Sequence, residues 1–312
     1  MTAMPLPQLD RLFLTDGGLE TDLIYNHGLE LPGFSAAMLL RKAEGRAALD
    51  RYFRAYLDLA RRARTGFVLE SASWRANADW APQLGVTPTE LDRLSGESVA
   101  MLKALKAEYE GPDLPIVVSG CIGPRGDGYV PGSLMGQREA ADYHLRQAAA
   151  LAAAGPDLLS AMTINNIPEA IGIARAAEKV GLPVAISFTV ETDGRLPTGD
   201  SLGAAIQMVD RATASYPAYF MINCAHPSHF APALAKGGSW TRRVQGLRAN
   251  ASRCSHAELE AMTELDAGDP HQLAEDYRRL RERFPQIKVL GGCCGTDRRH
   301  VAAIAEACLE AA

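Results

Sequence analysis

Short apolar runs alternate with longer amphipathic segments along this chain. We expect buried strands at residues 11–16, 66–71, 115–120, 157–163, 183–189, 219–224, 243–249 and 287–292. These runs are almost continuously apolar, which is typical of strands covered on both faces of a parallel sheet. Segments 47–63, 138–155 and 167–181 repeat apolar residues at steps of three and four, which predicts helices. Gly181 and Pro183 mark the end of one such helix and the start of the next strand.

Eight such alternations within about 300 residues predict an α/β protein with a (β/α)8 barrel, which we expect to form one domain over residues 1–312. A doubly wound open sheet is the alternative fold. The chain shows no linker, low-complexity tract or short repeat. In a barrel the active site lies at the C-terminal ends of the strands, so the residues that follow each predicted strand are the candidates for chemistry.

Composition and charge argue against a nucleic-acid-binding, membrane-spanning or secreted protein. The net charge is −5, and no basic stripe carries interleaved aromatic residues, so we expect no nucleic-acid partner. No apolar run approaches the roughly 18 residues that would predict a membrane span. The first residues lack the pattern of a secretory signal, and six cysteines in such a chain are not a disulfide framework. We therefore expect a cytoplasmic protein with reduced thiols. Neither a dinucleotide-binding nor a P-loop motif is present.

Three cysteines fall at the ends of predicted strands. Cys224 follows the sixth strand, and Cys293 and Cys294 follow the eighth. Sulfur ligands in this number suit Zn²⁺, and three protein ligands leave a fourth position open, as in catalytic zinc sites. Two alternatives stay open. Buried cysteines often act as small apolar side chains, and Cys293 with Cys294 could form a strained vicinal disulfide.

Glycines surround the adjacent cysteine pair. We expect Gly291, Gly292 and Gly295 to let the backbone bend so that both neighbouring sulfurs face one ion.

Four motifs carry a family resemblance: DGGLET, GCIGPRGDGY, INCAHP and GGCCGTD. Through these motifs, residues 11 to about 310 resemble the homocysteine S-methyltransferases, including the S-methylmethionine- and betaine-dependent enzymes. The resemblance implies a (β/α)8 barrel with zinc on the three cysteines. It implies transfer of a methyl group from S-methylmethionine, S-adenosylmethionine or betaine to the thiolate of homocysteine, giving methionine. The expected partners are a small thiol acceptor and a methyl donor, and assembly as a homo-oligomer is compatible with this.

Two other functions remain as alternatives. One is the same zinc–thiolate chemistry on a different thiol or onium substrate. The other is a barrel that binds zinc or a ligand without turnover. A cobalamin or folate domain is not expected, because one barrel uses the whole chain.

The resemblance also assigns substrate contacts. The carboxylate of Asp16 would hold the amino group of homocysteine, with Gly17 and Gly18 allowing close backbone approach; capping of the following helix is the alternative role for Asp16. Asn223 and Asn250 would line the pocket or cap strand ends. His226 could bind metal by residue type, but with three sulfurs nearby we expect it to lie outside the ligand set.

Two positions depart from the family pattern. Met162-Thr163 stands where members commonly carry Glu-Thr, whose glutamate contacts the substrate amino group. Glu70 stands where a neutral residue is usual, and a carboxylate at the end of a buried strand needs a partner. One hypothesis is that Glu70 replaces the missing glutamate. The other is that it pairs with Arg75 or Arg125. A pocket that no longer recognises an amino acid is a third outcome.

Aromatic residues complete the candidate set. Trp74, Trp80 and Tyr129 follow the second and third predicted strands, where they could favour a cationic donor or serve only as loop packing.

Overall fold

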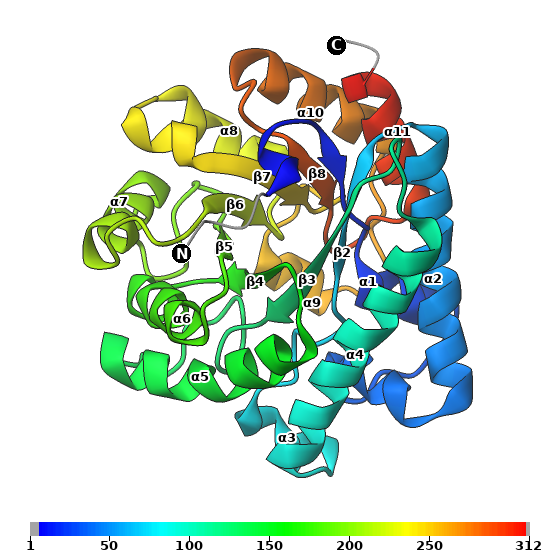
Figure 1. Ribbon diagram of the computed structural model, residues 1–312. Helices are drawn as coiled ribbons and strands as arrows, with labels where there is room; N and C mark the ends of the chain where they lie inside the picture. Colours follow the sequence, from blue (N-terminus) through cyan, green and yellow to red (C-terminus); the bar gives the residue numbers. More distant parts are fainter. Residues whose placement is uncertain (1–5, 310–312) are drawn as a thin grey trace.

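The computed structural model describes residues 6–309 and contains a closed barrel of eight parallel strands (Figure 1). Each strand pairs with the next in the sequence, and the last pairs with the first. The strands are β1 (Phe13–Leu14), β2 (Gly66–Glu70), β3 (Ile116–Ile122), β4 (Leu158–Ile164), β5 (Val184–Phe188), β6 (Tyr219–Asn223), β7 (Val244–Ala249) and β8 (Val289–Gly292). The predicted barrel is confirmed, and the open sheet is excluded.

Helices surround the strands on all sides in Figure 1. The longer ones are α2 (Ala43–Arg62), α4 (Pro88–Tyr109), α5 (Gln137–Ala154), α6 (Ile167–Val180), α7 (Leu202–Ala212), α8 (Pro227–Ala235), α10 (Pro270–Arg283) and α11 (Arg298–Leu309). Short helices α1 (Leu19–Thr21), α3 (Ala81–Leu84) and α9 (His256–Ala261) lie in connecting segments. Six further short turns of 3-10 or π helix are η1 (Pro7–Leu9), η2 (Asp22–Asn26), η3 (Pro32–Phe34), η4 (Ala36–Arg41), η5 (Ala78–Trp80) and η6 (Ser239–Arg243).

Local signals explain where these helices stop and start. Gly181 follows α6 in a left-handed conformation with φ of 74°, which glycine adopts without steric cost, and its N–H bonds to the carbonyl of Ala177. The Thr87 and Asn166 side chains cap α4 and α6 by accepting hydrogen bonds from backbone N–H groups. The three predicted helices are confirmed, and α2 begins four residues earlier than the pattern at 47–63 predicted.

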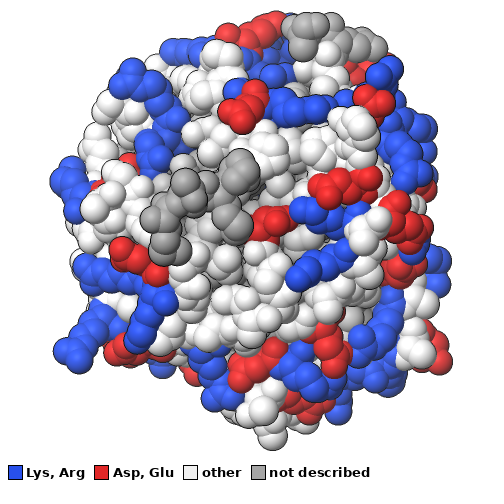
Figure 2. Space-filling view, viewed as in Figure 1, with Lys and Arg blue, Asp and Glu red and all other residues white. Residues whose placement is uncertain are grey.

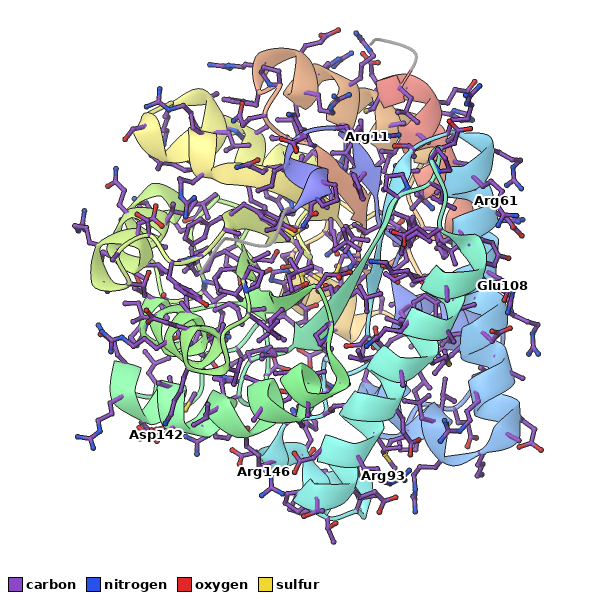
Figure 3. All side chains as sticks on the ribbon, in the orientation of Figure 1. Arg11, Arg61, Arg93, Glu108, Asp142 and Arg146 are labelled. Atoms are coloured by element: carbon purple, nitrogen blue, oxygen red, sulfur yellow. A yellow bond between two sulfur atoms is a disulfide. The ribbon has the colours of Figure 1, made fainter. Side chains whose placement is uncertain are left out.

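Charged residues face away from the barrel on the outer helices. Arg93, Glu108, Asp142 and Arg146 project outward from α4 and α5 in Figure 3. Lys, Arg, Asp and Glu side chains are interspersed over the face shown in Figure 2, without a large patch of one sign. Within residues 6–309, no helix combines the length and apolar character needed to cross a membrane.

The strands bury both faces, as their continuous apolar pattern predicted. One face packs against the helices in the larger core, and alternate residues fill the barrel because successive side chains point to opposite sides. The apolar part of the filling is formed by Phe13, Val68, Val117, Leu158, Ala185, Tyr219, Met221 and Val289. Toward the C-terminal ends of the strands the buried residues become polar, namely Glu70, Ser119, Ser160, Ser187 and Arg248. The barrel therefore offers a polar floor beneath its C-terminal mouth.

Candidate active site

A cavity opens at the C-terminal ends of the strands, where the residues of a barrel active site lie. Most of the residues expected from the sequence line it: Asp16, Gly17, Gly18, Glu70, Trp74, Tyr129, Met162, Thr163, Asn223, Cys224, Cys293 and Cys294. Asn250 is buried but lines a neighbouring hollow on the outer side of the mouth.

The three expected cysteines meet at this cavity. Their sulfur atoms all lie within 4.8 Å of one another, although Cys224 and the Cys293–Cys294 pair are far apart in the sequence. β6 and β8 bring them together, because both strands end at the same rim on either side of β7. Cys254 lies in a loop and Cys308 on α11, as expected.

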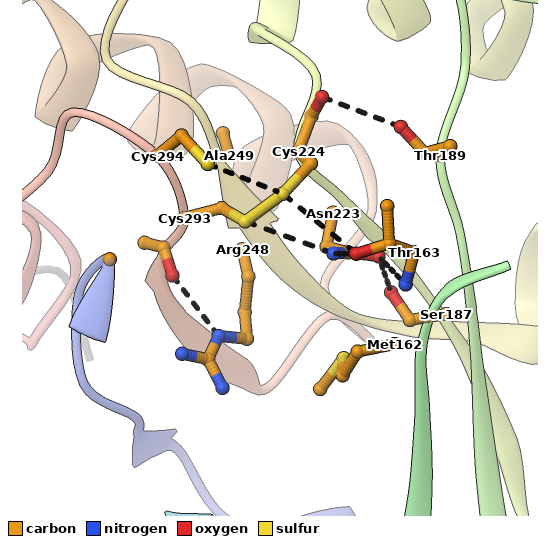
Figure 4. Close-up of a disulfide and its surroundings, with 12 residues drawn as sticks. Met162, Thr163, Ser187, Thr189, Asn223, Cys224, Arg248, Ala249, Cys293 and Cys294 are labelled. Carbon is orange, nitrogen blue, oxygen red and sulfur yellow. Dashed lines mark hydrogen bonds between the residues drawn. A yellow bond between two sulfur atoms is a disulfide. The ribbon is translucent and has the colours of Figure 1, made fainter. Parts of the chain in front are cut away.

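Two of these cysteines form a disulfide. Cys224 is bonded to Cys293, and the sulfur of Cys294 lies beside them, 4.0 Å from that of Cys224 (Figure 4). The alternative of a vicinal Cys293–Cys294 disulfide is thus wrong for this structure. Metal binding requires thiolates, so this pair must be reduced before it can ligate an ion.

The sulfur positions fit a tetrahedral ion once the disulfide opens. Zn–S bonds of about 2.3 Å at tetrahedral angles place sulfur atoms roughly 3.8 Å apart. The Cys224–Cys294 separation of 4.0 Å is close to that value. Burial raises the pKa of the Cys294 thiol to about 11, with the Tyr129 hydrogen bond opposing the shift. A bound cation would supply the charge that stabilises the thiolate here.

Each sulfur also has a polar neighbour from a different part of the rim. Thr163 Oγ1 lies 3.9 Å from the sulfur of Cys224, and Asn223 Nδ2 lies 3.8 Å from that of Cys293. Tyr129 Oη lies 3.8 Å from the sulfur of Cys294. Hydrogen bonds of this kind orient ligands and tune the charge on a metal centre.

The backbone adopts unusual conformations at the same place. Thr163 and Cys224 have positive φ values of 62° and 51°, which are uncommon for residues other than glycine. In a regular strand, consecutive side chains point to opposite faces. Here both Met162 and Thr163 line the cavity, as do both Asn223 and Cys224. The local distortion therefore turns two extra side chains toward the mouth.

Asn223 holds this distorted backbone in place. Its Oδ1 accepts hydrogen bonds from Thr163 N at 2.9 Å and Ser187 Oγ at 2.6 Å, and its Nδ2 donates to Thr163 Oγ1 at 2.8 Å (Figure 4). Replacing Asn223 with Ala should weaken zinc binding by about 10- to 100-fold, because two sulfurs lose their orienting partners. Competition with a chromogenic chelator measures this. Asn26→Ala, on the surface, is the matched control, and equal zinc affinity in both variants would contradict the role of Asn223.

The disulfide makes a second prediction. Protein purified without reductant should show four thiols per chain after denaturation, those of Cys121, Cys254, Cys294 and Cys308, and should bind no zinc at the cluster. Reduction before denaturation should raise the count to six and allow one zinc per chain. Ellman titration and metal analysis measure both values. Full zinc occupancy with only four thiols would show that the ion does not need these sulfurs.

The glycines near the cysteines have two different roles. Gly295 has a positive φ of 79° and forms the tight turn that was expected. Gly291 and Gly292 have no such conformation, so that prediction is wrong for them. A Cβ on Gly291 would lie 2.0 Å from Thr15 Oγ1, and one on Gly292 would lie 1.9 Å from Thr296 Oγ1. These two positions are glycine because the side chains of Thr15 and Thr296 pack directly against them.

Below the sulfurs, one arginine binds two carboxylates. Arg248 Nη2 donates to Asp16 Oδ1 at 2.6 Å, and Nη1 donates to Glu70 Oε2 at 2.5 Å. Its Nε donates to the carbonyl of Gly292, and Nη2 also donates to that of Gly17. Burial raises the pKa of both carboxyl groups, and the guanidinium opposes that rise. One positive charge for two acids leaves this buried group with an excess of negative charge.

Arg248 corrects one expectation. Glu70 pairs with neither Arg75 nor Arg125: the first lies over the Trp80 ring and 3.7 Å from Asp127, and the second pairs with Asp79. Glu70 lines the cavity while bound to Arg248, and its role as a replacement for the substrate-binding glutamate stays a prediction.

Asp16 is not a helix cap, because α1 has Gly18 at its N-cap and no side-chain cap. The Asp16 carboxylate accepts from Tyr52 Oη at 3.1 Å as well as from Arg248.

Of the remaining candidate site residues, some line the cavity and others lie outside it. His226 caps α8 and lies outside the cavity, and burial lowers its pKa to about 4. Trp80 is buried beneath Arg75 and does not line the cavity, so it serves as packing. Tyr129 packs against His256 with the two rings tilted and their centres 4.3 Å apart, and His256 Nε2 lies 2.6 Å from the carbonyl oxygen of Cys224. Trp74 donates to the carbonyl of Met162.

Sequence reasoning missed two charged residues of the cavity, Arg248 and Glu20. A signal existed for Arg248, since it is a charged residue between Leu247 and Ala249 near the end of the predicted strand 243–249. Glu20 lies within DGGLET but had no pattern that separated it from an exposed helix residue.

Comparison with known proteins agrees with this geometry. The sequence model of the homocysteine S-methyltransferases matches residues 13–308. Homocysteine S-methyltransferase 4 of Zea mays is 27% identical, covering 96% of this chain and 90% of that protein. Homocysteine S-methyltransferase 1 of Arabidopsis thaliana is 24% identical, covering 93% and 91%.

Solved structures of the Escherichia coli homocysteine methyltransferase MmuM have the same fold. Its oxidised form superimposes with a TM-score of 0.71 at 23% identity, covering 95% of this chain and 96% of that one. Its metallated form gives 0.69 at 22% identity over the same shares. With a family match that extends from β1 into α11, this chain, which gathers three cysteines at its barrel mouth, belongs to the homocysteine S-methyltransferase family.

Proposed function

We propose that the protein transfers a methyl group from a sulfonium or quaternary ammonium donor to the thiolate of homocysteine, giving methionine, and that the reaction depends on Zn²⁺ held by Cys224, Cys293 and Cys294. The observation that carries this proposal is the cluster of three cysteine sulfurs within 4.8 Å of one another at the mouth of a barrel cavity. Family membership supports the reaction class.

Zinc bound by three thiolates would lower the pKa of a thiol in its open position, so that the acceptor is a thiolate at neutral pH. The acceptor sulfur then forms a bond to the methyl carbon. The bond from that carbon to the donor atom breaks, and its electron pair stays with the donor, which becomes neutral. The proton of the acceptor thiol passes to the solvent before this step.

The chain's own residues position the reactants. Thr163, Asn223 and Tyr129 orient the three sulfurs from three directions. Phe34, Trp74 and Tyr129 line the cavity with aromatic rings, which attract an onium cation without neutralising it. Alignment of thiolate and methyl group accounts for much of the rate in such bimolecular transfers.

The test is methionine formation from homocysteine by reduced, zinc-loaded protein, with S-methylmethionine, S-adenosylmethionine and betaine as parallel donors. Methionine from at least one donor, lost on removal of zinc by a chelator and regained on its return, would support the proposal. Protein that holds one zinc per chain and yields no methionine with any of the three would contradict it.

A further inference from the structure

One carboxylate of the cavity has no counter-ion. Three acidic residues line the cavity, and two of them, Asp16 and Glu70, are bound to Arg248. The third, Glu20, makes no ion pair and no side-chain hydrogen bond to another residue within 6–309. The cavity therefore carries a carboxyl group without an ionic partner beside the cysteine cluster.

The fold holds Glu20 firmly at this place. On its N-terminal side, Gly18 N donates to the carbonyl of Thr296 at 3.0 Å. On its C-terminal side, Thr21 Oγ1 accepts from Gly295 N at 3.2 Å. Both contacts go to the turn that follows Cys293 and Cys294. A Cβ on Gly18 would lie 2.5 Å from the carbonyl oxygen of Cys293, so the two segments are in direct contact.

The nearby arginines are already occupied. Arg248 makes four hydrogen bonds to carboxylates and carbonyls, as described above. Arg75 donates to the carbonyl of Gly33 and lies against the Trp80 ring, with Asp127 as its charged partner. Burial raises the pKa of Glu20 to about 7, and the charge of Asp16 adds to the rise. A cation brought by a ligand would remove this electrostatic cost.

We propose that Glu20 binds the α-ammonium group of the thiol acceptor and so selects an amino acid thiol. This inference rests on the proposed function, because it takes homocysteine as the acceptor. It also assigns to α1 the contact that the family resemblance places at the position of Met162, where this chain has no charge.

The charge changes during the reaction favour the acceptor over the donor as the ligand of Glu20. A donor onium loses its positive charge as the methyl group leaves, so a carboxylate beside it would stabilise the ground state more than the transition state. The acceptor ammonium keeps its charge throughout. A contact to it lowers KM without slowing the transfer.

The test compares two thiols on zinc-loaded protein by calorimetry. L-homocysteine carries the ammonium group, and 4-mercaptobutanoate is the same thiol acid without it. Glu20→Gln should weaken homocysteine binding by about 10- to 100-fold, the range for a lost hydrogen bond to a charged group. It should leave 4-mercaptobutanoate binding almost unchanged. In turnover, KM for homocysteine should rise by a similar factor while kcat and the KM of the donor stay close to wild type.

Two further variants complete the design. Glu264→Gln removes an exposed charge from the outer hollow and should affect neither thiol. Glu20→Asp keeps the charge and should retain part of the preference for homocysteine. Equal weakening of both thiols by Glu20→Gln, or a rise in the KM of the donor instead, would overturn the inference. So would unchanged homocysteine binding.

Failure of the two proposals can be told apart. Wild-type protein that binds homocysteine and transfers no methyl group would contradict the proposed function, while the comparison of the two thiols would still decide the role of Glu20.

Discussion

Replacing Arg248 with Met should destabilise the protein by about 3–5 kcal/mol at neutral pH, because two buried carboxylates lose their shared counter-ion. Asp16 and Glu70 are both buried, and each accepts a short hydrogen bond from the guanidinium. Denaturant or thermal unfolding measures the loss. Arg146→Met is the matched control, since Arg146 forms an exposed pair with Asp92 that should contribute about 0–1 kcal/mol.

The loss in Arg248→Met should depend on pH. Without the guanidinium, the folded-state pKa of both carboxyl groups lies above its unfolded value of about 4. Groups shifted in this direction destabilise the fold increasingly as pH rises through their folded-state pKa. The deficit should therefore shrink as the pH is lowered from 7.5 to 5. Adding Asp16→Asn and Glu70→Gln should recover part of the stability at neutral pH. A deficit that stays constant with pH, or that equals the Arg146→Met control, would show that the carboxylates do not need Arg248.

Replacing Cys294 with Ser should remove zinc and methyl transfer together. The loss in zinc affinity should exceed the roughly 10- to 100-fold that follows from losing an outer partner of a metal ligand, because a ligand itself is removed. Cys294 is the informative choice among the three, since it lies outside the Cys224–Cys293 disulfide and its replacement leaves that pair intact. Metal analysis of the reduced protein and methionine formation give the two readouts.

Cys254→Ser is the control for Cys294→Ser, because Cys254 is a half-buried loop cysteine outside the cluster. It should keep one zinc per chain and full turnover. If Cys294→Ser did the same, the third ligand would have to come from another residue, and the proposed zinc site would be wrong in its composition.

The charges in the cavity bear on the role of Glu70, the glutamate at the end of β2. Glu70 is satisfied by Arg248, so its presence in a buried strand reflects an ion pair across the barrel. The cavity carboxyl group that Arg248 does not bind is Glu20, in the segment that contacts the turn after Cys293 and Cys294. Under the proposal for Glu20, substrate recognition would fall to the carboxylate that Arg248 does not bind, and the folded geometry decides which one that is.

The sequence alone determined the barrel and the cysteine site. Eight apolar runs separated by helical periodicity gave the strands to within a few residues, because burial on both faces requires continuous apolar sequence. Cys224, Cys293 and Cys294 could be grouped beforehand because parallel strands end at one rim. The glycine at 181 and the turn at 295 were also predictable, since their positive φ values suit glycine.

Tertiary structure decided the charges and the backbone detail at the mouth. Arg248 is 178 residues from Glu70 and 232 from Asp16, so their pairing depends on how β1, β2 and β7 face one another across the closed barrel. The unusual backbone at Thr163 is likewise held by hydrogen bonds to the Asn223 side chain, which join β4 to β6. Local sequence patterns predict burial and turns, because these depend on a few neighbouring residues. The partner of a buried charge is chosen among side chains that only the folded chain brings together.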